Sequence, residues 1–219
     1  MQFKITWNYI HKRLTTSFLS DWIPDQDILP IIEDIENTGR VKEMIIEDET
    51  GVKWTKKDLK KLLVQLKGEP DNIIIYFDGN YEKHTAIAGI GVVIYYKLGN
   101  EYYRKRINAR LEQLNSNNEA EYAALYFALE QLEMEKIKGK KVKINGDSQG
   151  LLKQLMDEWP CYEENLNRWL DRIEDKIKWL NLYPTFEIIG RNNNKEAHKL
   201  ASQAIENIII ESTQEINGY

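Results

Sequence analysis

The chain has 219 residues, of which 42% are hydrophobic and 30% charged, and its formal net charge at pH 7 is −5. This length predicts one large domain, or one domain with a small companion. No run of residues approaches the roughly 20 apolar residues of a transmembrane helix, which argues against a membrane partner. The single cysteine, Cys161, excludes an internal disulfide, and we therefore expect a cytoplasmic protein. The negative charge argues only mildly against bulk electrostatic binding of a polyanion, and net charge alone does not decide the partner.

The first 66 residues have the pattern of a small α+β accessory domain of the order ββαββα. Apolar residues alternate over 3–10, as in a half-buried strand, and 17–23 can pair with that strand across a turn. A helix is expected over 28–37 and a hairpin over 42–54. Thr55 is typical of a helix N-cap, and the helix after it places leucines on one face.

Residues 67–71, KGEPD, contain Gly68 and Pro70 and are expected to form a linker. The catalytic domain is then expected over 72–211, with a C-terminal tail at 212–219. Its patterns predict the order βββαβααβα, a mixed five-stranded sheet flanked by helices. The expected elements are strands at 73–78, 87–97 and 101–110, a helix at 117–134, a strand at 141–146, a helix from Ser148 toward Pro160, a helix at 163–180, a strand in TFEIIG, and a last helix at 195–209.

Three separated segments each place one carboxylate beside a structural transition. They are Asp78 in IIIYFDGN, Glu121 in NSNNEAEYAAL and Asp147 in KVKINGDSQGLL. Asp78 and Asp147 each end an apolar strand-like run, so we expect all three acids at the edge of one sheet. Carboxylate oxygens are the ligands that Mg²⁺ prefers, and the pattern therefore predicts a divalent-metal site. In the alternative interpretation, the two aspartates are turn residues and Glu121 is a solvated helix residue.

In order and spacing, YFDG, NNEAEYAAL and GDSQGLLKQL resemble the first three signatures of type 1 ribonuclease H, over about residues 71–211. The resemblance implies a ribonuclease H-like fold and hydrolysis of the RNA strand of RNA–DNA hybrids. It also implies two Mg²⁺ or Mn²⁺ ions per site, roughly 4 Å apart, that activate water and stabilise the leaving oxygen. By this resemblance, Asp78 bridges both ions, while Glu121 and Asp147 hold the leaving-group ion. The enzyme is expected to be a monomer.

The fourth signature departs from the family. NKEAH keeps Asn194 and Ala197 but supplies His198 where the family usually has an acid. His198 is interpreted as a metal ligand or proton-transfer residue, which would favour Mn²⁺ over Mg²⁺. Two alternatives stay open: a neutral residue in an enzyme that works on three acids, and an inactive site kept as a binding module. Glu196 cannot substitute, because two residues along a helix turn it about 200° away.

Four residues beside the acids match family positions that touch the hybrid: Gly79, Asn80, Asn117 and Asn118. Such contacts read the shape of the hybrid rather than its base sequence. Asparagine-rich turns also arise for purely conformational reasons.

The N-terminal unit contains a second candidate surface in VKWTKKDLKK, where Trp54 is accompanied by Lys53, Lys56, Lys57, Lys60 and Lys61. Aromatic and basic side chains together can bind nucleic acid. The alternatives are a solvated lysine face with Trp54 in the core, or a protein-interaction surface.

The sequence thus predicts a two-metal endoribonuclease acting on RNA–DNA hybrids. The first alternative is a catalytically weak or inactive relative that binds hybrid or double-stranded RNA. The second is an interaction module in which the acids have only structural roles.

Overall fold

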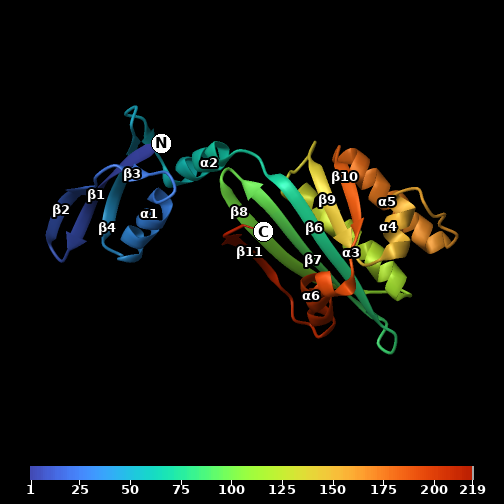
Figure 1. The fold of residues 1–219 in the computed structure, drawn as a ribbon. Helices are drawn as coiled ribbons and strands as arrows, with labels where there is room; N and C mark the ends of the chain where they lie inside the picture. Colours follow the sequence, from blue (N-terminus) through green and yellow to red (C-terminus); the bar gives the residue numbers. More distant parts are fainter. Residues whose placement is uncertain (219) are drawn as a thin grey trace. The chain divides into compact units, whose positions relative to one another are not determined.

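The structure is a computed structural model that describes residues 1–218, and the chain separates into two compact units, Met1–Gly68 and Glu69–Tyr219 (Figure 1). Each unit has its own cluster of buried apolar side chains. None of the helices within residues 1–218 combines the length and apolar character needed to span a bilayer.

The N-terminal unit is a small sheet covered by two helices. Its strands are β1 (Gln2–His11), β2 (Leu14–Leu19), β3 (Ile23–Pro24), β4 (Val41–Asp48) and β5 (Lys53–Trp54), arranged in the order β2-β1-β4-β5 with β3 beside β1. The helices are α1 (Ile28–Asn37) and α2 (Lys56–Lys67). Phe3 and Ile5 alternate inward from β1 and pack with Ile32 and Leu59 from the helices. The hairpin over 42–54 and both expected helices are confirmed. The strand expected over 17–23 does pair with β1, but β2 begins earlier, at Leu14, and ends at Leu19, and Ile23 belongs to the separate strand β3.

The lysine-rich face of this unit is largely occupied by internal contacts. The Trp54 indole N–H donates to the buried Asp48 carboxylate at 2.8 Å. Lys56 lies 2.5 Å from Glu36, and Lys60 lies 3.3 Å from Glu33, so acids of α1 offset the charge of α2. These contacts favour the interpretation of a solvated lysine face with a structural tryptophan.

The second unit is built on a six-stranded mixed sheet in the order β10-β9-β6-β7-β8-β11. Strands β6 (Asp71–Glu82), β7 (Ile87–Leu98) and β8 (Glu101–Glu112) form the expected antiparallel meander. Strands β9 (Lys141–Gly146) and β10 (Tyr183–Ile188) extend it in parallel. The helices are α3 (Asn117–Met134), α4 (Gln149–Leu155), α5 (Glu164–Trp179) and α6 (Lys195–Ile205), with a short 3₁₀ turn at Arg191–Asn193. The ribonuclease H-like mixed sheet with flanking helices is confirmed.

The sheet has one strand more than the five expected. The additional strand, β11 (Glu211–Ile216), pairs antiparallel with β8 and lies in the segment expected to be a C-terminal tail. The last helix ends at Ile205 rather than near 209. The Asn108 side chain explains the turn between them: its amide donates to the Leu200 and Ile208 carbonyls, and its oxygen accepts from Ile210 N–H. The sequence ESTQEI has little apolar alternation, so this strand rests on backbone pairing and gives no local signal.

Helices α3 and α6 pack on opposite faces of the central strands β6 and β7. Ile75 and Phe77 of β6 belong to the α3-side core, whereas Val93 of β7 packs with Ala197 and Leu200 of α6. Close approach of α6 depends on Gly91, where an added Cβ would lie 2.2 Å from the Ala197 carbonyl oxygen. Because Gly91 has no side chain, the first turns of α6 can pack directly against the backbone of β7.

We expect Gly91→Ala to destabilise the second unit by about 1–3 kcal/mol, because a methyl group overpacks a backbone contact that cannot yield. Gly150→Ala is the matched control, since a Cβ there meets no atom within 4 Å. Urea unfolding of both variants checks this. Equal stability of Gly91→Ala and the wild type would show that α6 is free to shift.

Candidate active site

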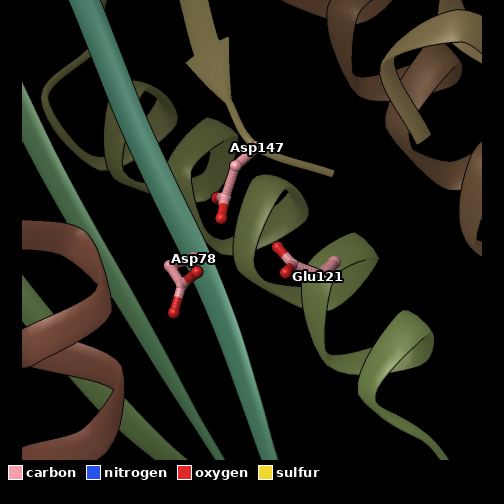
Figure 2. A group of neighbouring side chains, drawn as sticks. All are labelled: Asp78, Glu121 and Asp147. Atoms are coloured by element: carbon pink, nitrogen blue, oxygen red, sulfur yellow. The ribbon is translucent and has the colours of Figure 1, made fainter. Parts of the chain in front are cut away.

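Three carboxylates from distant parts of the chain meet at one point of the second unit. Asp78, Glu121 and Asp147 each offer an oxygen, and these oxygens all lie within 4.8 Å of one another. Figure 2 shows the three side chains turned toward one another from β6, α3 and the segment that follows β9. Asp78 and Glu121 are buried, and Asp147 is partly exposed. The cluster therefore has an opening to solvent on the Asp147 side.

Parallel pairing of β6 with β9 brings the two aspartates together. The register runs from Ile73 opposite Val142 to Tyr76 opposite Asn145, and both strands then reach the same edge. The expectation that Asp78 ends its strand is wrong, because β6 continues to Glu82 and Asp78 pairs with Gly91 of β7. Only the pairing with β9 ends before Asp78. Beyond this point β9 no longer pairs with β6, and Asp147, which follows β9, lies close to Asp78.

Glu121 reaches the aspartates because α3 lies unusually close to β6. The Ser116 side chain caps α3 by accepting from Glu119 N–H at 3.1 Å, so Glu121 falls in its second turn. A Cβ at Gly79 would lie 2.2 Å from the Ala120 backbone. Gly79 N–H donates to Glu121 Oε2 at 3.2 Å. Gly79 therefore fixes the carboxylate of Glu121 beside that of Asp78.

The cluster lacks sufficient positive charge to balance its acids. Burial raises the pKa of Glu121 to about 9, with further contributions from the negative charges of Asp78 and Asp147. Burial also raises the pKa of Asp78 to about 6, although the hydrogen bond from His198 opposes this shift. Both shifts indicate a site that favours protons or a cation over free carboxylates.

His198 contacts Asp78 and not the other two acids. Its Nδ1 lies 3.0 Å from Asp78 Oδ2, and its Nε2 lies 3.3 Å from an Arg191 guanidinium nitrogen. A guanidinium can only donate, so Nε2 is the acceptor and Nδ1 carries the proton donated to Asp78. Both ring nitrogens are therefore engaged, and within residues 1–218 the carboxylate group that could hold a metal forms without His198.

Asn194 links the start of α6 to two strands of the site. It is 1% exposed, and its amide nitrogen donates to the Phe77 carbonyl at 2.8 Å and to Asp147 Oδ1 at 2.6 Å. Asn194 stands at the N-cap position of α6, but its side chain makes no cap hydrogen bond to the helix. Arg191 and Asn194 are the two site residues whose contacts the sequence did not indicate. The asparagine-rich stretch around them was the available signal.

Glu196 points away from the carboxylates, as its helical spacing requires. Its oxygens lie 3.2 Å from Arg104, 2.9 Å from Arg106 and 3.2 Å from the Tyr95 hydroxyl. These partners lie on β7 and β8. Glu196 therefore does not replace the missing fourth acid.

The residues expected to contact substrate fall into two groups. Gly79 is buried beneath α3, and Asn80 donates to the Ser202 hydroxyl at 3.4 Å. Asn117 and Asn118 are exposed at the start of α3, where Asn117 accepts from Tyr81 N–H at 3.1 Å. The first group supports the packing of the site, and the second is accessible to a bound partner.

Comparison with known proteins agrees with this geometry. Residues 76–204 match the family described as reverse transcriptase-like. The chain is 42% identical to the uncharacterized protein YpeP of Bacillus subtilis over 195 residues, which is 89% of this chain and 86% of that protein. LC11-RNase H1 in complex with an RNA/DNA hybrid is 30% identical, with a TM-score of 0.54 over 62% of this chain and 98% of the other. RNase H1 of Halobacterium salinarum NRC-1 is 25% identical, with a TM-score of 0.53 over 62% and 98% of the two chains. The chain therefore belongs to the reverse transcriptase-like family and carries a type 1 ribonuclease H-like domain.

Proposed function

We propose that this protein is a cytoplasmic, metal-dependent endoribonuclease that hydrolyses the RNA strand of RNA–DNA hybrids. The observation that carries the proposal is the cluster of Asp78, Glu121 and Asp147, whose oxygens lie within 4.8 Å. The similarity to LC11-RNase H1, whose structure holds an RNA/DNA hybrid, supports the substrate class.

The donor set fits divalent metal ions such as Mg²⁺ or Mn²⁺. All three donors are carboxylates, which are hard oxygen ligands, and two of them have pKa values raised by burial and mutual repulsion. Two bound ions would supply an activated water and charge stabilisation for phosphodiester hydrolysis. Asp78, Glu121 and Asp147 would hold them.

The surrounding side chains orient these ligands. His198 donates to Asp78, and Asn194 donates to Asp147, so each aspartate is held by one partner from the start of α6. Hydrogen-bonded carboxylates keep one oxygen aimed at the metal while the other is occupied. We therefore assign His198 to positioning Asp78, rather than to direct metal binding.

The start of α3 supplies the proposed substrate contact. Asn117 and Asn118 are exposed there, next to the helix turn that carries Glu121. Amide side chains can donate to and accept from sugar hydroxyls in the shallow minor groove of a hybrid. Recognition of this kind reads groove shape, and little preference for base sequence is expected.

Cleavage of a labelled RNA–DNA hybrid tests the activity directly, in Mg²⁺ and separately in Mn²⁺. Asp78→Asn should abolish metal-dependent cleavage, because it removes a charged ligand while keeping the side-chain shape. Asp157→Asn is the matched control: Asp157 is exposed and has a φ of 58°, which asparagine tolerates well. Its activity should equal that of the wild type.

Absence of cleavage in both metals, with hybrid binding intact, would reject the enzyme and support a hybrid-binding module. Absence of both cleavage and binding would leave the three acids with a structural role only.

Thermal unfolding as a function of pH tests the metal site without a substrate. Because the pKa values of Asp78 and Glu121 are raised, the stabilising contribution of these two carboxyl groups in the metal-free protein is complete below about pH 4. It is lost as pH rises through about 6 for Asp78 and about 9 for Glu121. Saturating Mg²⁺ should therefore raise the melting temperature more at about pH 8 than at about pH 5. Glu121→Gln should flatten the dependence in EDTA. A melting temperature in EDTA that stays constant from about pH 4 to about pH 9 would contradict this assignment.

The role of His198 can be separated from metal binding by His198→Ala. Loss of the hydrogen bond to Asp78 should lower kcat about 10- to 100-fold, as for other groups that orient metal ligands. The ratio of activity in Mg²⁺ to that in Mn²⁺ should stay unchanged. Lys199→Ala, which alters an exposed neighbour on the same helix, should retain full activity. A shift of the metal ratio in His198→Ala would instead identify His198 as a ligand.

A further inference from the structure

A hollow lies on the α6 side of the sheet. It is a pocket of about 520 Å³, formed by β6, β7, the 3₁₀ turn and the start of α6. Volumes of this size accommodate small organic ligands. None of the three carboxylates of the candidate active site lines it.

Two tyrosines form the aromatic part of the pocket. Tyr76 and Tyr95 are both partly exposed, and their rings meet edge to face with centroids 5.9 Å apart. Val93 contributes apolar surface beside them. A flat aromatic ligand could pack against such a wall, because π-systems favour stacked and edge-on contacts.

The start of α6 forms the polar rim of the pocket. Lys195, Glu196 and Ala197 line it, and they form the first turn of an 11-residue helix. The first N–H groups of a helix have no partner within the helix, and α6 lacks a side-chain cap because Asn194 binds Phe77 and Asp147 instead. Such a terminus attracts anions, phosphate in particular.

The charged side chains of the rim and their ion-pair partners are net positive, although Asp147, which Asn194 contacts, places a negative charge close by. The Glu196 carboxylate is flanked by Arg104 and Arg106 at 3.2 and 2.9 Å, so the three side chains together carry one positive charge. Lys195 is exposed on the same rim and adds a second.

A buried acceptor gives an independent indication of a ligand. Asn194 lines the pocket and is 1% exposed, yet its amide oxygen has no donor within the described part of the chain. Buried polar atoms in native proteins nearly always have partners, so this oxygen calls for a hydroxyl or amino donor.

We propose that this pocket binds a nucleoside monophosphate unit. The base packs against Tyr76 and Tyr95, the phosphate lies at the start of α6 beside Lys195, and a sugar hydroxyl or base amino group donates toward the amide oxygen of Asn194. A nucleotide combines an aromatic ring, hydrogen-bond donors and an anion, which are the three features that the lining requires.

The position of the pocket links it to the candidate active site. Tyr76 and Asp78 are two residues apart on one face of β6, a separation of roughly 6.6 Å along the strand. Asn194 lines the pocket and also donates to Asp147. The nucleotide could therefore be free in solution or be an unpaired residue of a strand that continues from the active site. Nucleotide binding itself does not depend on the proposed cleavage activity.

Isothermal titration in EDTA tests the pocket apart from catalysis. The probes are adenosine 5′-monophosphate, adenosine, and RNA–DNA hybrids with and without a single-stranded RNA overhang. We expect adenosine 5′-monophosphate to bind more tightly than adenosine, or the overhanging hybrid to bind more tightly than the blunt one. The first result identifies the free nucleotide as the ligand, and the second identifies an unpaired residue of the substrate.

Two charge reversals on α6 locate the binding. Lys195→Glu should weaken that binding at least about tenfold, because it places a negative charge at the phosphate position. Lys199→Glu carries the same change on an exposed residue outside the pocket lining and should bind like the wild type. The proposal is overturned if neither preference is seen, or if both variants retain wild-type affinity.

Discussion

Mutual repulsion among three carboxylates is the constraint on which the candidate active site of this protein depends. Asp78, Glu121 and Asp147 lie within 4.8 Å of one another, and burial removes the water that would otherwise screen them. The fold holds them together against this cost through apolar packing elsewhere. The raised pKa values of Asp78 and Glu121 express the same imbalance, which protons relieve at low pH and a divalent cation would relieve at neutral pH.

The positions of the helices around the cluster depend on two glycines, which have no side chain to keep the backbones apart. Gly79 lets α3 approach β6, and Gly91 lets α6 approach β7 from the opposite face. The two helices thereby place Glu121 and His198 on either side of Asp78. Because the contacts are backbone against backbone, they leave little room for adjustment, and this rigidity suits a site whose oxygens must keep fixed separations.

Residues at the start of helix α6 contact two different regions, the carboxylate cluster and the arginines of β8. His198 and Asn194 face the carboxylates, while Glu196 faces Arg104 and Arg106 two residues away. The diversion of Asn194 to Asp147 leaves the helix without a side-chain cap, next to a pocket of about 520 Å³. One asparagine therefore couples the orientation of a candidate metal ligand to the polar rim of the neighbouring pocket.

The sequence by itself determined the meander, the helices and the three acids, because apolar periodicity and short signatures around Asp78, Glu121 and Asp147 are local properties of the chain. Tertiary structure alone decided the sixth strand, the contacts of His198 and the pocket beside α6. Strand β11 depends on pairing with the edge of β8 and on the Asn108 side chain, which lies about a hundred residues away in sequence. His198 contacts Asp78 on β6 and Arg191 in the 3₁₀ turn through its two ring nitrogens, and nothing in the sequence around His198 indicates these partners. Contacts of this kind join side chains from separate elements, so no pattern within either segment specifies them.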